Sequence, residues 1–316
     1  MAPESNVLVY FNNEYVPLAD AKVGILTHAL HYGTGVFEGI RGYWDAEEEE
    51  LYLVRPLEHY QRWRTNCRIL RMELGVEPHH LTQITAELVK RNQFRTNIYI
   101  RPLAWRSAQR IGVHPDDELA FSIIGIPFGD YLDSRNGLNA GVVSWRRAQD
   151  TAIPGRAKIC GAYVNSALAS DEARANGFDE AILLNDDGHV AEGATCNIFT
   201  VRGHKLITPP PSDNILEGIT RDSVMQLARH EMGLDVVERS IDRTELYVAE
   251  EVFFTGTAVE VAPIIKVDHR AVGNGKIGPV TGELRQLYAD AARGRLRKWR
   301  DWVYPVYRRL RAGRAA

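Results

Sequence analysis

A polar, turn-rich stretch at residues 129–137, GDYLDSRNG, divides this chain into two segments that each mix strand and helix patterns. Such a stretch is typical of a connection between domains, where few contacts cross. With 316 residues, the chain is long enough to form two packed domains. We therefore expect a small N-terminal domain over residues 1–128 and a larger C-terminal domain over residues 138–316, joined by this linker.

Strand and helix signals follow one another in the first segment. Runs rich in β-branched and aromatic residues predict strands at 7–11, 14–18, 39–44, 51–56, 97–105 and 119–128. Apolar residues recur with helical spacing at 56–72 and 78–94. The acidic run from Glu47 to Glu50 is typical of a solvated hairpin turn. This order indicates a mixed α+β domain.

The second segment continues with elements of both kinds. The pattern predicts a strand at 138–147, a helix at 164–177 that ends at Gly177, and a hairpin with its turn at 186–188. The stretch from Leu216 to Gly233 predicts a further helix. Thr220 is the expected N-cap of this helix and Gly233 its expected C-cap.

The C-terminal segment RGRLRKWRDWVYPVYRRLRAGR is basic and carries aromatic residues. It fits either a nucleic-acid-binding tail or a solvated final helix that packs its aromatic side chains on the domain. The net charge of the whole chain is −3, which argues against a nucleic-acid-binding protein. We therefore expect the final helix and no nucleic-acid partner.

The chain carries no sign of a membrane or secreted protein. No apolar run approaches the roughly 20 residues that span a bilayer. The N-terminus lacks the basic and then apolar regions of a secretory signal. The three cysteines, Cys67, Cys160 and Cys196, form no Cys-x-x-Cys pair, which fits a reducing compartment. We expect a cytoplasmic protein.

Lys158, in the stretch AIPGRAKICGAY, stands among small and apolar neighbours. Most lysines are surface cations, but this setting would desolvate the ammonium group and lower its pKa. A lowered pKa is what a lysine needs to form a Schiff base with a carbonyl compound. Burial alone does not identify a cofactor.

Glu192, in HVAEGATCNIF, interrupts an apolar strand just after the predicted hairpin turn. From local sequence it is either a strand-end carboxylate that faces water or the partner of a ring nitrogen that must stay protonated. Pyridoxal 5'-phosphate (PLP) acts as an electron sink only while such a group holds its pyridinium charged.

Two further stretches could bind an anion. The residues from Leu216 to Thr220 come immediately before a predicted helix, where free N–H groups and the positive end of the helix dipole favour phosphate. Gly218 within them allows close backbone approach, although many ordinary helices also begin this way. The turn from Thr255 to Ala258 adds hydroxyl and amide donors.

Arg62 and Arg101 are the remaining candidates for binding an anion. Arg101 shares one face of a predicted strand with Tyr99. An arginine on an apolar strand needs a partner, either a structural carboxylate or the carboxylate of a substrate. His28 and His31 have helical i, i+3 spacing, but no third ligand is near in sequence, so we expect no metal site there.

Taken together, these segments resemble the branched-chain amino-acid aminotransferases, which are fold-type IV PLP enzymes. The likeness covers nearly the whole chain in the family's order. The matching pieces are AKVGILTHALHYGTGVFEGIRGY, NIYIRPL, IPGRAKICGAYVNSALASDEA, GHVAEGATCNIF, ITPP, ILEGITRD and TGTAVE. The resemblance implies a two-domain α+β fold like that of D-amino-acid aminotransferase, with PLP bound mainly by the C-terminal domain.

The resemblance also implies roles for individual residues. Lys158 takes the place of the family's Schiff-base lysine, Tyr163 that of the tyrosine on the cofactor's phenolic oxygen, and Glu192 that of the carboxylate on the pyridine nitrogen. The residues that fall where the family holds the phosphate and the ring are Arg62, Leu216, Gly218, Ile219, Thr220 and Thr257.

The substrate pocket is implied in the same way. The residues that match it are Tyr32, Phe37, Tyr99, Arg101, Tyr131, Thr257 and Ala258. In the family, Tyr32 enters the pocket from a neighbouring subunit, so a homodimer or larger homo-oligomer is implied. Two departures concern substrate range: the lysine loop lacks the alanine- and glycine-rich form of one bacterial branch, and Cys196 stands where the family often has glutamate.

The implied reaction is PLP-dependent transamination of L-leucine, L-isoleucine and L-valine with 2-oxoglutarate. D-amino-acid aminotransferases, (R)-amine transaminases and aminodeoxychorismate lyases could share Lys158 and Glu192. The Tyr99–Arg101 pattern and the GVHP loop at 112–115 favour the branched-chain group. A non-enzymatic nucleic-acid-binding protein is the alternative from another functional class.

Overall fold

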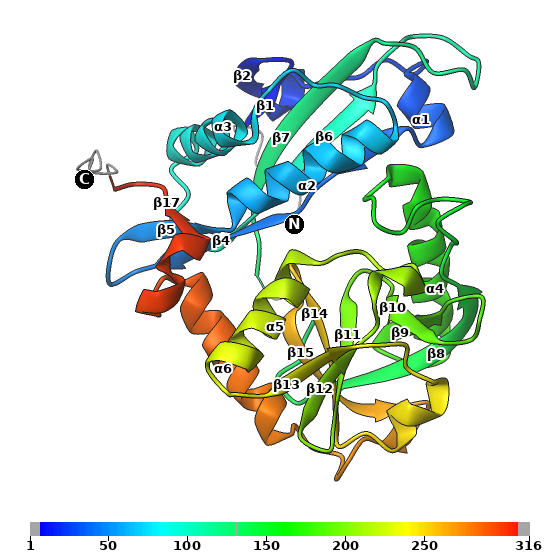
Figure 1. The fold of residues 1–316 in the computed structure, drawn as a ribbon. Helices are drawn as coiled ribbons and strands as arrows, with labels where there is room; N and C mark the ends of the chain where they lie inside the picture. The colour runs from blue at the N-terminus through cyan, green and yellow to red at the C-terminus, as the bar shows by residue number, and fades with distance from the viewer. Residues whose placement is uncertain (1–6, 130–131, 309–316) are drawn as a thin grey trace. The chain divides into compact units, whose positions relative to one another are not determined.

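The chain folds into two compact units, each built on its own β-sheet (Figure 1). The computed structural model describes residues 7–129 and 132–308. Unit 1 comprises the described residues up to Gly129, residues 159–161 and residues 290–308, and unit 2 comprises the rest. Both units combine helices and sheets, which confirms the α+β prediction.

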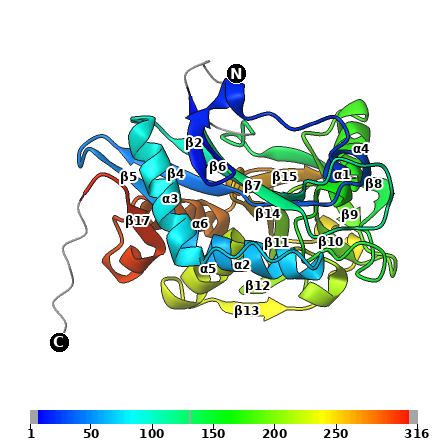
Figure 2. The ribbon, with the colours of Figure 1, turned by 90° about the horizontal axis from the view of Figure 1, so that it is seen from above.

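Unit 1 contains an eight-stranded antiparallel sheet. Its strands, in spatial order, are β17 (Val303–Pro305), β5 (Glu50–Val54), β4 (Ile40–Asp45), β6 (Ile98–Arg106), β7 (Leu119–Pro127), β1 (Leu8–Phe11) and β2 (Glu14–Pro17), with β3 (Gly35–Phe37) paired to β6. Two helices, α2 (Pro56–Ile69) and α3 (Pro78–Arg91), pack together on one face of this sheet (Figure 2). The short helix α1 (His28–Tyr32) precedes β3.

Unit 2 contains a nine-stranded mixed sheet. Its strands, in spatial order, are β10 (Val190–Gly193), β9 (Glu180–Leu184), β8 (Leu138–Arg146), β15 (Glu260–Val267), β14 (Glu251–Gly256), β11 (Asn197–Arg202), β12 (Lys205–Thr208) and β13 (Asp235–Glu238), with β16 (Arg270–Ala271) beside β15. Helices α4 (Tyr163–Ala175), α5 (Ile219–His230) and most of α6 (Pro279–Ala292) belong to this unit. Its main hydrophobic core is formed by buried side chains such as Ile198, Phe254 and Ile264.

Of the helix ends predicted in unit 2, one agrees with the structure and two differ. Gly177 follows α4 with φ +79°, and Phe178 N donates to Ala173 O, as expected of a left-handed C-terminal turn. The expected turn at 186–188 joins β9 to β10. The prediction that Thr220 caps α5 was wrong, because Gly218 is the N-cap and Thr220 is the second helical residue. Gly233, with φ +64°, lies two residues beyond the actual C-cap, Glu231.

The C-terminal segment is not the helix that its periodicity indicated. Helix α6 ends at Ala292, Gly294 takes φ +67°, and the chain continues as a 3-10 helix, Arg297–Trp302, and strand β17. The expected packing of its aromatic residues is nevertheless present, since Trp299 and Trp302 are buried. These residues belong to unit 1, whereas the sequence placed them in the C-terminal domain.

Glu50 explains why this segment returns to unit 1. The predicted solvated turn holds for Glu47 to Glu49, but the Glu50 side chain is fully buried. Its carboxylate accepts backbone N–H bonds from Val306, Tyr307 and Arg308 at 2.8–2.9 Å. These bonds satisfy three backbone donors beyond the end of β17 and fix the segment beside β5.

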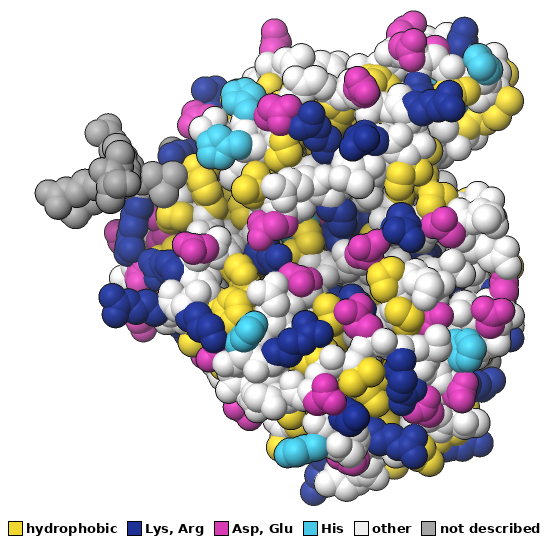
Figure 3. Space-filling model, in the orientation of Figure 1, with side chains coloured by type: hydrophobic (Ala, Val, Ile, Leu, Met, Phe, Trp, Pro, Cys, Tyr) yellow, Lys and Arg dark blue, Asp and Glu magenta, His cyan; other side chains and the backbone are white. Residues whose placement is uncertain are grey.

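Among the described residues, no helix is long and apolar enough to cross a membrane. On the face of the molecule that Figure 3 presents, basic and acidic side chains are interspersed. That face therefore offers no extended basic surface for a polyanion.

Candidate active site

Lys158 lies at the end of a loop that packs tightly against the segment before α5. Gly155 leaves no room for a side chain, because a Cβ there would lie 2.2 Å from Asn214 O. Arg156 in the same loop forms ion pairs with Asp150 and Glu217. Lys158 is half-buried, and its Nζ donates a 2.6 Å hydrogen bond to Tyr163 Oη. The loop therefore presents the amine beside the tyrosine that the sequence paired with it.

Glu192 lies in strand β10 and is 5% exposed, so it is not the water-facing carboxylate that local sequence also allowed. Its Oε2 accepts hydrogen bonds from Asn197 Nδ2 at 2.9 Å and Leu216 N at 3.1 Å. Its Oε1 lies 2.8 Å from Arg147 Nε in a buried ion pair. Burial raises the pKa of the Glu192 carboxyl, while the charges of Arg147 and Lys158 and the Leu216 N–H lower it in part.

Sequence reasoning missed two residues of this group, Arg147 and Asn197. Asn197 also donates to Leu216 O at 2.8 Å, so it links Glu192 to the approach of α5. A polar residue at the start of the apolar strand NIFTV was a signal that could have identified it. Arg147 gave no such signal, because it follows the exposed Arg146 and resembles one of two surface cations.

The start of α5 is a helix N-terminus with glycine as its N-cap. Gly218 is extended, with φ −71° and ψ 134°, and a Cβ on it would lie 2.0 Å from Asn197 Oδ1. Only glycine fits this N-cap without displacing Asn197. Thr220 lies in the first turn of α5, where the backbone N–H groups have no acceptor one turn earlier in the helix. An anion is the ligand that they favour.

Strand β14 contributes a buried hydroxyl group that has no hydrogen-bond partner in the described part of the chain. Thr255 is fully buried, and its Oγ1 makes no hydrogen bond within the described part of the chain. It lies directly opposite Asn197 across the β11–β14 pair, so both side chains belong to the same face of the sheet. Thr257 and Ala258 follow in the half-buried turn between β14 and β15. An orphaned buried hydroxyl calls for a ligand or a water molecule.

Three of the predicted substrate residues gather within unit 1. Arg101 Nη2 donates to Tyr99 Oη at 3.1 Å, and its guanidinium lies 4.5 Å from the centre of the Phe37 ring. Gly39 is necessary here, because a Cβ would lie 2.0 Å from Tyr99 Oη. Arg101 is exposed, and no carboxylate of the described residues pairs with it. The cluster combines one cation, one hydroxyl and one apolar ring.

Arg62 is held by a buried carboxylate of the same unit. Its Nε and Nη2 lie 2.7 and 2.8 Å from the two oxygens of Glu38, which is fully buried. His59 Nδ1 lies 2.9 Å from the same carboxylate. Although burial acts to raise it, the Arg62 charge and the His59 contact hold the pKa of Glu38 well below its ordinary value. Glu38 therefore stays ionised and orients Arg62 on α2.

The remaining sequence candidates have local partners. Tyr32 Oη accepts a 2.9 Å hydrogen bond from Gly112 N, which joins α1 to the GVHP loop. His28 contacts Thr34 Oγ1 and Val113 O, and His31 contacts Ile25 O. Tyr131 lies outside the described residues.

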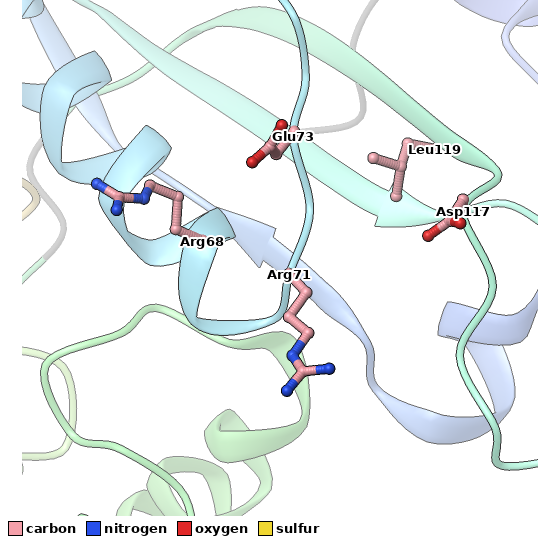
Figure 4. A pocket seen from close by; sticks show the side chains of 5 residues that line it. All are labelled: Arg68, Arg71, Glu73, Asp117 and Leu119. Atoms are coloured by element: carbon pink, nitrogen blue, oxygen red, sulfur yellow. The ribbon is translucent and has the colours of Figure 1, made fainter.

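Three cavities of unit 1 lie away from the predicted site residues. One of about 420 Å³ is lined by Arg68, Arg71, Glu73, Asp117 and Leu119 (Figure 4). Two others, of about 620 and 860 Å³, surround the α2–α3 connection. None of the three includes a predicted site residue. A small cavity of about 30 Å³ in unit 2 is lined partly by Ala258.

Comparison with known proteins is specific. The family model for amino-transferase class IV matches residues 35–267. A protein of Aquifex aeolicus named probable branched-chain-amino-acid aminotransferase is 48% identical, over 94% of this chain and 96% of that protein. The crystal structure of the branched-chain aminotransferase from Thermoproteus uzoniensis with norvaline matches with a TM-score of 0.91 and 41% identity, over 95% of this chain and 99% of that one. The branched-chain amino acid aminotransferase from Thermobaculum terrenum in its PLP form matches with a TM-score of 0.92 and 38% identity, over 96% and 99% of the chains.

Proposed function

This chain belongs to the branched-chain amino-acid aminotransferases of class IV, and from this premise we propose that it transfers the amino group of L-leucine, L-isoleucine or L-valine to 2-oxoglutarate. The products are branched-chain 2-oxo acids and L-glutamate, so the reaction ends the synthesis of these amino acids or begins their breakdown. The observation that carries the proposal is the grouping of Lys158, the buried Glu192 and the start of α5 within unit 2.

The residues of unit 2 fit pyridoxal 5'-phosphate. Lys158 would hold the cofactor covalently through its amine, and Tyr163 and Leu216 would contact its ring. The glycine N-cap of α5 and the orphaned Thr255 hydroxyl are the features that favour a bound phosphate ester. The groups of unit 2 that would hold this phosphate are Gly218, Ile219, Thr220 and Thr257, and the family resemblance adds Arg62.

The bound cofactor supplies an electron sink for the electron pair of the broken Cα–H bond. The Lys158 amine would remove the proton from the substrate Cα as general base and would then deliver it, as general acid, to the C4' carbon of the cofactor. Tyr163, which accepts the hydrogen bond from Nζ, orients that amine. Glu192 would hold the proton on the ring nitrogen, because a carboxylate beside a ring N–H favours its protonated form.

The unit 1 cluster suits the substrates. Phe37 offers an apolar surface to the aliphatic side chain, and Arg101 offers a cation to the γ-carboxylate of glutamate. Tyr99 and the amides at Thr257 and Ala258 would hold the α-carboxylate, and Tyr131 would assist Arg101. The cluster thus provides both an apolar surface and a cation for the two kinds of substrate side chain.

A homodimer or larger assembly follows from the surface around Tyr32. Several large apolar side chains of the segment 23–32 and of the GVHP loop are exposed, among them Ile25 at 76% and Val113 at 75%. Apolar side chains gather at the end of unit 1 where α1 lies (Figure 3). Such a patch marks an interface between chains. Sedimentation of the purified protein as a monomer would contradict this part of the proposal.

The three cysteines are unpaired, which supports a cytoplasmic location.

The visible spectrum of the purified protein tests the proposed function. We expect a cofactor band that bleaches on addition of L-leucine and returns on addition of 2-oxoglutarate, because the two half-reactions interconvert two forms of the cofactor. Absence of a band would contradict the cofactor. A band that responds to D-alanine or (R)-1-phenylethylamine but not to L-leucine would instead assign the chain to another group of this fold.

Arg101→Leu separates the two substrates in the same assay. We expect the glutamate half-reaction to slow by roughly 10- to 100-fold, because a hydrogen bond to a charged group contributes about 1.5–3 kcal/mol. The leucine half-reaction should change little, since its side chain carries no charge. Arg91→Leu, at an exposed arginine of the same unit, is the matched control. Equal losses in both half-reactions would argue against this role.

A further inference from the structure

The oxygen atoms of Glu192 leave one acceptor position open. A carboxylate can accept about four hydrogen bonds, two on each oxygen. Oε2 already accepts two, from Asn197 and Leu216. Oε1 has one charged neighbour, Arg147, at 2.8 Å. A protonated ring nitrogen would therefore share Oε1 with the guanidinium of Arg147.

The pairing of β8, β9 and β10 places Arg147 beside Glu192. Arg147 follows β8, and its backbone N donates a 2.9 Å hydrogen bond to Leu184 O, which holds it beside strand β9. Glu192 lies on β10, paired with Leu183 of the same β9. The two side chains are 10% and 6% exposed, so little water reaches the pair. The attraction between the opposite charges of the two side chains outweighs their hydrogen bond in lowering the pKa of Glu192.

The balance of charges around Glu192 shows what Arg147 does. The charged and titratable groups of unit 2 that act on Glu192 or respond to it are Arg147, Lys158 and Cys196. Burial and the nearby glutamates raise the pKa of Cys196 well above its ordinary value, so that group stays a neutral thiol. Arg147 is the largest influence that opposes the burial of Glu192. The Lys158 amine changes its charge when it bonds a carbonyl group, whereas an arginine stays charged throughout.

We propose that Arg147 is the positioning residue that keeps the Glu192 carboxylate ionised, so that the proton shared with the cofactor resides on the ring nitrogen. Only the protonation of the ring nitrogen rests on the proposed function; the effect of Arg147 on the ionisation of Glu192 does not. Without Arg147, burial favours the neutral carboxyl, and the proton moves from the ring nitrogen to Glu192. The ring then accepts electrons less well, although every group that touches the substrate is unchanged.

The first test uses the cofactor-free protein and reads the carboxyl group directly. Difference infrared spectra of wild type and Arg147→Met are recorded against pH, and the band that Glu192→Gln removes is assigned to Glu192. Because a neighbouring cation stabilises the ionised form, its loss should raise the midpoint of this band by at least about one pH unit, a tenfold shift. An unchanged midpoint would overturn the proposal.

Charge at position 147 can be separated from packing. Arg147→Lys keeps a cation and should recover part of the wild-type midpoint. If Arg147→Lys and Arg147→Met have the same midpoint, the charge does not control ionisation and the proposal fails. Arg147→Gln replaces Arg147→Met if the latter does not fold. Arg156→Met, which removes an exposed arginine paired with Asp150 and Glu217, should leave the midpoint unchanged.

The second test uses the cofactor-loaded enzyme. Arg147→Met should lower kcat by roughly 10- to 100-fold, the range found when a residue that orients a functional side chain is removed. The KM for leucine should change less. In a Glu192→Gln background the same change should have less than about a twofold effect, because residues that act through one another are not additive. An equal loss in both backgrounds would refute a role through Glu192. If wild type proves inactive, the proposed function fails, whereas the infrared test still decides whether Arg147 sets the ionisation of Glu192.

Discussion

Lys158→Ala is expected to lower transamination by about 10⁴-fold or more, which corresponds to about 5 kcal/mol of activation free energy. The variant loses the only amine placed beside Tyr163 in the described part of unit 2 that could both hold the cofactor and move the substrate proton. The absorbance of the covalently held cofactor should vanish as well. Single-turnover assays with L-leucine and the visible spectrum are the measurements.

The fold should survive this change. Lys158 is only half-buried, and the loop that carries it is held by Gly155 and Arg156 rather than by the amine. Thermal unfolding should therefore be near that of wild type. Lys205→Ala, which removes an exposed lysine paired with Asp235, is the control and should be fully active. Wild-type activity in Lys158→Ala would refute the assignment of this site.

Glu192→Gln should reduce turnover by about 10²–10³-fold, the range seen when one preorganised electrostatic contact is removed. A neutral amide cannot hold the ring nitrogen protonated, and its own NH₂ group would face the Arg147 guanidinium. Leaving a buried cation without its carboxylate costs about 3–5 kcal/mol of stability as well. Pre-steady-state rates and urea unfolding measure the two effects separately.

Glu180→Gln is the matched control for this variant. Glu180 is 5% exposed on β9 of the same sheet, and burial raises its pKa as it does that of Glu192. Its carboxylate accepts backbone hydrogen bonds from Ala181 and Ala194, and it has no contact with Lys158 or Leu216 among the interactions of the described residues. We expect the substitution to change stability but to leave turnover within about twofold of wild type. Comparable losses of turnover in both variants would mean that Glu192 acts through folding alone.

Local patterns succeeded where the chain's own geometry decides the outcome. The predicted strands β1, β2 and β4 to β8, the left-handed Gly177 and the turn at 186–188 depend on residues within a few positions of each other. They failed at Thr220. The N-cap of α5 is Gly218, where the close approach of the Asn197 side chain from β11 leaves no room for a Cβ. They failed again after Ala292. There the buried Glu50 carboxylate, 256 residues away in sequence, accepts hydrogen bonds from backbone N–H groups beginning at Val306, and the preceding residues pair as strand β17.

The sequence by itself determined which residues have the right chemistry: an amine among small neighbours at Lys158, a carboxylate within an apolar strand at Glu192, and an anion-binding helix start at Gly218. Only the tertiary structure decided their electrostatic state. It places Arg147, which looks like a surface cation along the chain, 2.8 Å from Glu192 in a buried pair. The reason is physical: burial and the position of a neighbouring charge depend on which strands adjoin, and no short stretch of sequence contains that information.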